Sequence, residues 1–235
     1  FSPGRSWDQL RVSVAYSMAN VKVAGNHTGL SVGPDGATHQ ALEDIAITRV
    51  IPNMTVVVPC DSIEARKTTV ALGTTAGPAY FRLGREKTAV MTTEETPFTV
   101  GKASVFKEGK DVAIIGSGPI LYAGLQAALE LEKEGISVLV INNHTIKPMD
   151  VETITWAAKL TGAVVTLEEH QTMGGAGSAV AEVLAEHYPV PIEMICMPNS
   201  FGESGNPDEL LKKFGMDKDA IVKAVRKVLT RKTEN

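Results

Sequence analysis

Short apolar segments alternate with amphipathic ones along two stretches of the chain, and this order limits the possible folds more than any other feature. In the first stretch, apolar segments at 54–58 and 79–83 flank a helical pattern at 61–73. Asp61 and Glu64 open that helix with the spacing of a capping box. An order of strand, helix and strand is typical of a parallel sheet covered by helices. We therefore predict an α/β fold.

The remainder of the first stretch predicts two more helices, another strand and a long loop. These elements are a helix at 5–18, a strand at 21–25, a glycine-rich loop at 26–38 and a helix at 39–50. Thr38 is the expected N-cap of the last helix, and Pro52 is expected to stop it.

The second stretch has the pattern of a complete, small, doubly wound domain. Its predicted strands are 112–115, 138–141, 163–167 and 192–196. Its predicted helices are 120–133, 151–160, 176–187, 207–214 and 218–232. The sequence therefore predicts two parallel-sheet, doubly wound domains.

Between these stretches the alternation stops, which indicates a domain boundary. Residues 94–110 are rich in threonine and charge, and we predict a linker there with one short strand at 99–106. The chain then divides into a first domain at 1–93, the linker, and a second domain at 111–235. Because the first domain has few strands, we expect it to be incomplete at its N-terminus.

Composition excludes several classes of protein. The chain is 43% hydrophobic and 21% charged, which is ordinary for a globular protein, and its net charge of −4 indicates no basic face for nucleic acid. Its longest apolar runs are far shorter than the roughly 20 residues of a membrane span, and it opens with no signal peptide. Cys60 and Cys196 stand far apart and suit a reducing compartment. We expect a cytoplasmic protein that binds neither nucleic acid nor membranes.

The glycine-rich loop contains the best candidates for chemistry. It holds His27, Asp35 and His39, and loops at the carboxyl ends of parallel strands are where α/β proteins bind ligands. At the start of a helix the macrodipole favours a neutral imidazole, so His39 is expected to donate one hydrogen bond and accept another. Asp35 offers acceptors for hydroxyl groups.

Simpler interpretations of the same residues stay open. His39 is equally explained as a surface or capping residue, and Asp35 as a turn residue. The three side chains are also of types that bind zinc. Two arginines follow the strand at 79–83: Arg82 and Arg85 each suit a phosphate or carboxylate, whereas an ion pair with Glu86 explains an arginine here without a ligand.

Two glycine clusters and one polar cluster are weaker candidates for a site. The cluster at 116–119 lacks the third glycine and the acidic residue of a dinucleotide fingerprint. The cluster at 173–178 suits close packing of a helix on its sheet. The Glu168–Glu169–His170 run at a strand end suits a contact between domains or subunits rather than catalysis.

Several stretches carry a family resemblance that covers essentially the whole chain in order. The sequences at 29–46, 52–61 and 80–85 (G-L-S-V-G-P-D-G-A-T-H-Q-A-L-E-D-I-A, P-N-M-T-V-V-V-P-C-D and Y-F-R-L-G-R) closely resemble the pyrimidine-binding domain of transketolases. Later stretches, including V-I-N-N-H-T-I-K-P-M-D, V-T-L-E-E-H, G-G-A-G-S-A-V-A-E-V-L and F-G-E-S-G, are similar to that family's C-terminal domain. The chain looks most like the small, C-terminal subunit of a split transketolase.

This resemblance implies an activity, cofactors and partners. The expected reaction transfers a two-carbon ketol unit between sugar phosphates, as in the pentose phosphate pathway, with thiamine diphosphate and Mg²⁺. The motif that holds the metal and the diphosphate belongs to another domain, so a separate diphosphate-binding subunit is expected, in a heterotetramer built as a dimer of heterodimers. We expect the chain to be inactive without that partner.

The resemblance also implies roles for single residues. His39 matches the histidine that contacts the donor sugar near the reacting carbons, and is the expected catalytic residue. Asp35 matches the aspartate that recognises a donor hydroxyl, while His27 and Arg85 match residues that hold the sugar-phosphate end. Phe1 matches the aromatic residue that stacks on the aminopyrimidine of thiamine diphosphate. The glutamate that protonates this ring has its place before Phe1.

Four alternatives stay open beside this prediction. An enzyme like 1-deoxy-D-xylulose-5-phosphate synthase shares the T-H-Q region and a G-G-A-G-like segment, although F-G-E-S-G and P-D-E-L-L-K-K-F-G fit transketolase better. The β subunit of 2-oxo acid dehydrogenases is a more distant relative. A non-catalytic interaction module and a zinc hydrolase complete the set.

Overall fold

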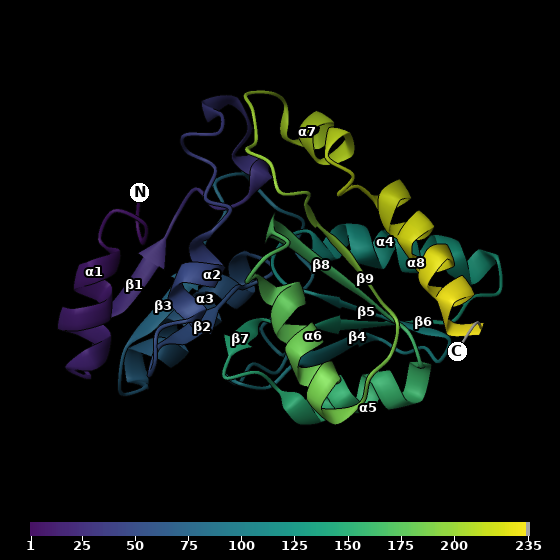
Figure 1. Ribbon diagram of the computed structural model, residues 1–235, viewed down its shortest axis with the longest axis horizontal. Coiled ribbons are helices and arrows are strands. Elements are labelled where there is room, and N and C mark those ends of the chain that lie inside the picture. The colour runs from purple at the N-terminus through teal and green to yellow at the C-terminus, as the bar shows by residue number, and fades with distance from the viewer. Residues whose placement is uncertain (234–235) are drawn as a thin grey trace.

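Nine strands form two sheets in the part of the chain that the structure, a computed structural model, describes, which is residues 1–233. The first sheet has the order β1-β3-β2-β7 and the second the order β4-β6-β5-β8-β9 (Figure 1). The strands are β1 (Lys22–Gly25), β2 (Thr55–Val57), β3 (Ala79–Arg82), β4 (Ser104–Lys107), β5 (Val112–Gly116), β6 (Val138–Asn142), β7 (Thr145–Lys147), β8 (Val164–Gln171) and β9 (Ile192–Met197).

Helices flank both sheets. They are α1 (Trp7–Gln9), the π-helical segment η1 (Leu10–Tyr16), the 3₁₀ segment η2 (Leu30–Asp35), α2 (Asp44–Arg49), α3 (Ser62–Thr74), α4 (Leu121–Lys133), α5 (Val151–Thr161), α6 (Ala176–His187), α7 (Pro207–Lys213) and α8 (Lys218–Thr233). No helix within residues 1–233 is both long and apolar enough to cross a membrane.

The α/β fold predicted from the sequence is confirmed, with one correction to its sheets. β1, β3 and β2 are parallel, as are β6, β5, β8 and β9. Each sheet, however, also carries one antiparallel strand, β7 beside β2 and β4 beside β6. The sheets are therefore mixed rather than purely parallel.

Strand β7 ties the two halves of the chain together. It follows β6 of the second sheet directly, yet it pairs with β2 of the first sheet, with Val56 opposite Lys147. The ammonium group of Lys147 then donates to the backbone carbonyls of Arg49 and Ile51, at 2.9 and 2.6 Å. Because one short strand crosses to the other sheet, neither sheet is assembled from a continuous stretch of sequence. The sequence pattern did not predict this strand.

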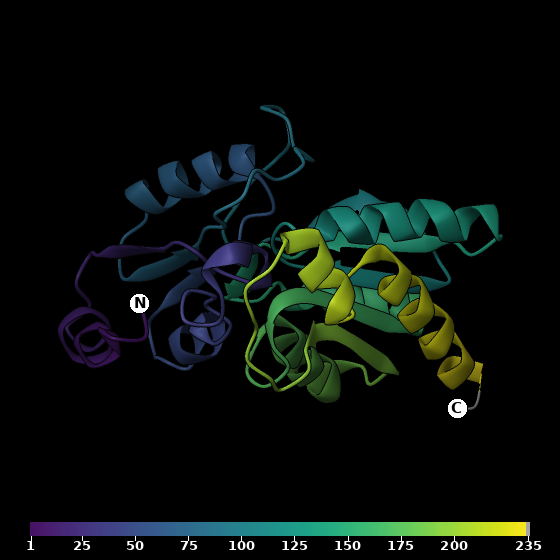
Figure 2. The same ribbon diagram turned by 90° about the horizontal axis from the view of Figure 1, so that it is seen from above.

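Apolar side chains fill the space between each sheet and its helices. On the second sheet, α4 and α8 cover one face, with Leu131 and Val225 in the core, and α5 and α6 cover the other (Figure 1). On the first sheet, α3 covers one face through Leu72, while η1 and α2 cover the opposite face through Leu10 and Ile45 (Figure 2). Both sheets are thus buried on two faces, which explains their continuous apolar strands.

The capping box predicted at the start of α3 is present. Asp61 accepts a hydrogen bond from the backbone N–H of Glu64 at 2.9 Å, and Glu64 accepts one from Cys60 N–H at 2.7 Å. Glu64 also accepts from the side-chain amide of Asn142 at 2.7 Å, so the cap reaches β6 of the second sheet. Burial raises the pKa of the Glu64 carboxyl, while the hydrogen bonds it accepts oppose that shift.

Two predicted helices differ from the structure. Instead of one α-helix at 5–18, the chain forms the single turn α1 followed by η1. Instead of a helix at 39–50, α2 begins only at Asp44, and Thr38 bonds to the His39 ring rather than capping a helix. The reason is tertiary: a β-bridge between Thr28 and Ala41 holds the chain out of the helical conformation just before α2.

The stretch predicted as a linker contains structure that belongs to the second sheet. Within 94–110, β4 pairs with β6, with Ser104 opposite Asn142. The strand predicted at 99–106 therefore exists in part, a few residues further along the chain.

Candidate functional site

The loop at 26–41 starts and ends at the same place. Gly29 N–H donates to Ala41 C=O at 2.9 Å, and Ala41 N–H donates to His27 C=O at 3.2 Å. Inside the loop, Gly33 and Gly36 have φ values of 72° and 75°, in the left-handed region that favours glycine. The loop projects from the carboxyl end of β1, as predicted, and holds η2 along with all three predicted polar residues.

Asp35 and Arg85 form an ion pair. One guanidinium nitrogen of Arg85 lies 3.0 Å from the Asp35 carboxylate, and it also donates to Val32 C=O at 3.2 Å. Both side chains are about one-third exposed, at 32% for Asp35 and 36% for Arg85, so each remains accessible to a ligand. Arg85 also forms the predicted ion pair with Glu86, but at a longer nitrogen–oxygen distance of 3.8 Å. The structure thus brings two of the predicted site residues together.

His39 and Phe1 form a second pair of predicted site residues. Their ring centroids are 5.3 Å apart in an edge-to-face arrangement. Both side chains are exposed, and the Phe1 ring remains 69% exposed even with the Arg5 guanidinium 4.8 Å from its centre. Because α2 begins five residues after His39, the predicted influence of a helix dipole on this imidazole was wrong.

His27 lies at the base of the loop with an unusual backbone conformation. Its φ of 57° falls in the left-handed region, which a residue with a side chain rarely adopts, and the side chain is exposed. Such a conformation costs about 1–3 kcal/mol and is often retained at functional positions. The loop therefore retains this backbone conformation at an energetic cost.

Arg82 does not serve as an open anion anchor. It is only 5% exposed, and it donates to the Asp44 carboxylate at 2.8 Å and to the backbone carbonyls of Ala41 and Glu169 at 2.9 and 2.7 Å. Burial by itself lowers the pKa of Arg82, and the facing Asp44 carboxylate more than reverses that effect. Tyr80 donates to the same carboxylate at 2.7 Å. Arg82 therefore stabilises the end of the loop at 26–41 from inside the protein.

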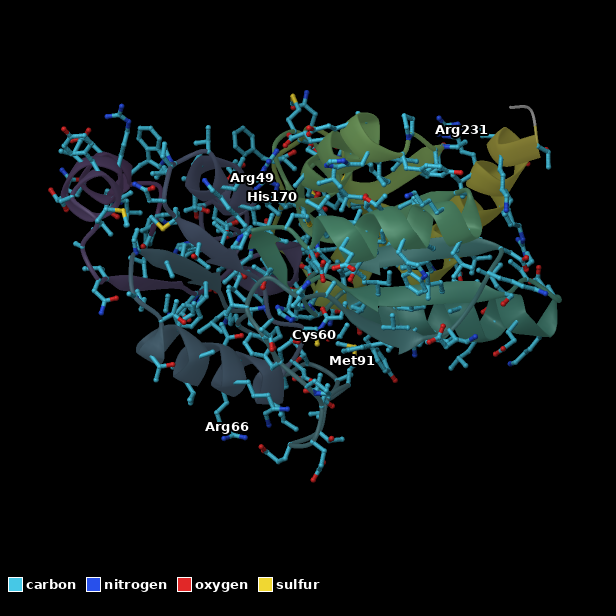
Figure 3. All side chains as sticks on the ribbon, turned by 90° about the horizontal axis from the view of Figure 1, so that it is seen from below. Arg49, Cys60, Arg66, Met91, His170 and Arg231 are labelled. Carbon is cyan, nitrogen blue, oxygen red and sulfur yellow. The ribbon has the colours of Figure 1, made fainter. Side chains whose placement is uncertain are left out.

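The Glu168–Glu169–His170 run contacts the other half of the chain, as predicted. The Glu169 carboxylate accepts from Ser31 N–H at 2.8 Å, and His170 Nε2 accepts from Ala46 N–H at 3.3 Å. Arg49, labelled with His170 in Figure 3, adds another contact between the two halves by donating to Gly174 C=O at 2.6 Å. The second sheet thus supports the site loop directly.

Gln40 is a site residue that sequence reasoning missed. It is only 4% exposed, and its side-chain amide donates to the carbonyls of Leu30 at 3.2 Å and Glu203 at 2.9 Å. Leu30 belongs to the site loop and Glu203 to the second half of the chain. The only feature of the sequence that could have pointed to Gln40 is its position next to His39.

The two glycine clusters serve packing rather than nucleotide binding. In the cluster at 173–178, a Cβ on Gly177 would stand 2.6 Å from the Thr166 hydroxyl, so α6 approaches its sheet as closely as predicted. The Glu168 carboxylate caps the N-terminus of α6, because it accepts hydrogen bonds from Ala176 N–H at 2.7 Å and Gly177 N–H at 2.8 Å. In the other cluster, Ser117 donates to Asn143 C=O at 3.0 Å.

The set of His27, Asp35 and His39 does not have the arrangement of a zinc site. Across residues 1–233, no group of three or more His, Cys, Asp or Glu side chains is placed to hold a metal ion together. The zinc interpretation of this loop is therefore not supported by its geometry.

Comparison with known families matches both halves of the chain. Residues 1–90 match the pyrimidine-binding domain of transketolase, and residues 101–221 match the transketolase C-terminal domain. The chain belongs to the transketolase family. The resemblance noted in the sequence is thereby confirmed, and all of the predicted site residues fall within the pyrimidine-binding match.

Similar transketolases include proteins that are named as transketolase subunits. The chain is 42% identical over 232 residues to the 6-deoxy-6-sulfo-D-fructose transketolase subunit SqwH of Clostridium sp., covering 99% of this chain and 72% of that one. It is 40% identical over 224 residues to a subunit of the apulose-4-phosphate transketolase of Phocaeicola vulgatus, covering 95% and 72%. A solved split-gene transketolase, described as an inactive β4 tetramer, superposes with a TM-score of 0.93 at 44% identity, covering 99% of this chain and 74% of that one.

Proposed function

We propose that this chain is the subunit of a split transketolase that supplies the pyrimidine-binding and C-terminal domains. Together with a separate diphosphate-binding subunit, it transfers a two-carbon ketol unit from a ketose phosphate to an aldose phosphate. The single observation that carries this proposal is the partly exposed ion pair between Asp35 of the glycine-rich loop and Arg85. The contact between the exposed rings of His39 and Phe1 accompanies it. Similarity to proteins named as transketolase subunits supports the proposal.

The exposed side chains suit the two ends of a sugar phosphate. Arg85 presents a planar set of donors, which matches phosphate geometry, and it stays one-third exposed while paired with Asp35. The Asp35 carboxylate accepts hydrogen bonds from sugar hydroxyls. A phosphate that approaches Arg85 competes with this carboxylate, so substrate binding loosens the ion pair and frees Asp35 for a hydroxyl. His27, at the base of the loop, adds an imidazole donor for the phosphate end.

His39 is the proposed catalytic residue. An imidazole exchanges protons with hydroxyl groups near neutral pH, and making or breaking the bond beside a ketone moves a proton on and off a sugar hydroxyl. The Thr38 hydroxyl lies 2.9 Å from the inner ring nitrogen Nδ1 and fixes the ring. The outer nitrogen is then directed to the substrate.

The Phe1 ring fits the aminopyrimidine of thiamine diphosphate. Flat heteroaromatic rings stack on aromatic side chains, and Phe1 offers a largely exposed ring beside His39. When bound, thiamine diphosphate supplies the nucleophilic carbon and the electron sink for cleaving the bond next to the ketone. We assign the diphosphate and Mg²⁺ to the partner subunit and propose a dimer of heterodimers in the cytoplasm. We also retain the division of the chain at residues 94–110.

The test is reconstitution with the partner. The complete product of the gene is mixed with the diphosphate-binding subunit, thiamine diphosphate, Mg²⁺, a ketose phosphate donor and an aldose phosphate acceptor for the ketol unit. Release of the shortened aldose phosphate from the donor is followed with a coupled dehydrogenase. We expect turnover only in the mixture. In that mixture His39→Ala should lower kcat by about 10²-fold or more, the size of a lost proton-transfer group.

The matched control is His187→Ala, which removes another exposed imidazole at the far end of α6. We expect this variant to retain full activity. Turnover that is absent from the wild-type mixture would favour the non-catalytic interaction module, and an unimpaired His39→Ala variant would remove His39 from the catalytic role.

A further inference from the structure

Residues 202–207, here called the strap, belong to the second half of the chain and pack against the loop at 26–41, here called the site loop. A Cβ on Gly33 would stand 2.9 Å from the Pro207 ring, and one on Gly36 would stand 2.5 Å from the Ser204 hydroxyl. In Figure 1 the chain leading into α7 rises beside the segment that contains η2. The strap and the site loop are therefore in direct contact.

Gln40 joins the strap to the loop through the two N–H donors of its side-chain amide. Its nitrogen donates to Glu203 C=O at 2.9 Å on the strap and to Leu30 C=O at 3.2 Å on the loop, and Gly33 C=O lies farther away at 3.5 Å. An amide nitrogen donates without a charge, so it satisfies buried carbonyls from both segments. A carboxylate at the same place would face the same carbonyl oxygens with no proton to donate.

Gly202 contacts the same amide from the strap side. A Cβ built on this glycine would collide with the amide oxygen of Gln40 and approach the Leu30 side chain to 2.8 Å. Its backbone lies outside the left-handed region that resists side chains, so alanine is permitted by its conformation and excluded only by Gln40 and Leu30. The strap and Gln40 thus fit one another closely.

Further contacts hold the strap and the loop in place. Lys213 of α7 pairs with Glu203, and Asn206 caps α7 by accepting from Asp208 N–H at 3.0 Å. From the other side, Glu169 accepts from Ser31 N–H at 2.8 Å. The loop that bears Asp35 is therefore fixed at several points by the second half of the chain.

We propose that the C-terminal half of this transketolase subunit positions the sugar-binding loop, with Gln40 as the positioning residue that couples the strap to Asp35 and His39. Gln40 lies next to His39 in sequence and donates to the carbonyl of Leu30, at the start of the η2 segment that ends at Asp35. A shift of about 1 Å in such a loop is enough to cost roughly 10²-fold in rate. This proposal rests on the proposed function for its kinetic outcome, but not for its structural one.

The structural test is hydrogen exchange on the full chain in complex with its partner subunit. Gln40→Glu keeps the size of the side chain and removes its donors, so we expect backbone amides in peptides spanning 30–42 to exchange at least about tenfold faster. Gln171→Glu is the matched control, because Gln171 donates to Ser200 C=O at 2.7 Å, before the strap, and makes no side-chain bond to the loop. We expect the control to leave exchange at 30–42 unchanged. Unchanged exchange in both Gln40→Glu and Gly202→Ala would overturn the proposal, whether or not the complex has activity.

The kinetic test is a cycle of two substitutions, each read as kcat and KM for the ketose phosphate. Gly202→Ala alone should lower kcat/KM by about tenfold or more, since its new methyl group displaces Gln40. In a Gln40→Ala background the colliding amide is gone and the Leu30 side chain can move into the space that it leaves, so the same substitution should change kcat/KM by less than about twofold. Such loss of additivity shows that the two residues act through one contact.

An equal effect of Gly202→Ala in both backgrounds would overturn the proposed role of Gln40. That result would mean the strap acts through Leu30 or not at all. A wild-type complex with no ketol transfer would instead refute the proposed function, and the exchange experiment would still decide whether the strap positions the loop.

Discussion

The ion pair between Asp35 and Arg85 joins two residues that are 50 positions apart in sequence, with 3.0 Å between carboxylate and guanidinium. It closes the glycine-rich loop over the end of β3, and both partners stay partly exposed. A pair of this kind contributes little to stability, because solvent screens the charges. We therefore expect the Asp35–Arg85 pair to contribute to ligand binding rather than to stability.

Replacing Arg85 should weaken binding without unfolding the protein. Arg85→Ala is expected to raise KM for phosphate-bearing substrates by about 10–100-fold, the effect of about 1.5–3 kcal/mol from a lost charge-assisted hydrogen bond. Its free energy of unfolding should fall by no more than about 1 kcal/mol. Steady-state kinetics and urea unfolding measure the two quantities. Glu86→Ala removes the more distant partner of the same guanidinium and should leave KM within about twofold.

His27 allows a substitution that separates its backbone from its side chain. Asparagine tolerates the left-handed conformation of this residue, so His27→Asn removes the imidazole with little added strain. We expect KM for sugar phosphates to rise at least about fivefold while the melting temperature stays within a few degrees. Activity equal to wild type would show that the conformation at His27 serves the loop alone.

The buried pair of Arg82 and Asp44 should be essential to stability. Asp44→Ala leaves the Arg82 guanidinium buried opposite no carboxylate, and removing one member of such a pair costs about 3–5 kcal/mol. Urea unfolding should show that loss. Glu182→Ala, which removes an exposed carboxylate from its pair with Arg49, should cost no more than about 1 kcal/mol. Similar losses in both variants would contradict the assignment of Arg82 as a buried support.

His144 should make stability depend on pH. Its imidazole is fully buried and stacked on Phe98 with ring centroids 4.4 Å apart, and burial lowers its pKa to about 4. Between pH 4 and about 6.5 the unfolded chain binds a proton at this residue that the folded chain does not, so the free energy of unfolding rises with pH across that window. A pKa difference of this size corresponds to about 3 kcal/mol of folding free energy.

His144→Phe is the variant that tests this dependence. It keeps an aromatic ring to stack on Phe98 and removes the titrating group. We expect the variant to lose less stability than wild type on acidification from pH 6.5 to 4.5, as measured by urea unfolding at each pH. Parallel curves for the two proteins would show that His144 does not titrate in this range.

Elements whose signals are local could be predicted from the sequence. The capping box of Asp61 and Glu64 places the start of α3, because a cap depends on residues three apart. Helix α6 was predicted with its exact bounds, since its apolar face and flanking glycines lie within one segment. The polar candidates His27, Asp35 and His39 could also be named from the sequence, because they lie together in one glycine-rich loop, and their roles stay predictions.

Other features were out of reach because they depend on residues far apart in the chain. The helix expected at 39–50 starts late because Thr28 bridges Ala41, and a propensity argument does not see that bridge. Strand β7 is three residues long and pairs with a strand nearly 90 positions earlier. Gln40 looked like an ordinary polar residue until its bond to Glu203 was seen.

Arg82 and Arg85 show the difference between what the sequence determines and what the tertiary structure decides. The sequence alone determined the α/β class, the order of most elements and the glycine-rich loop with its imidazoles and carboxylate, because periodicity and turn chemistry are local properties. Only the tertiary structure decided which arginine is buried against Asp44 and which faces solvent beside Asp35. Burial and ion pairing depend on which distant segments meet, and that is set by packing of the whole chain.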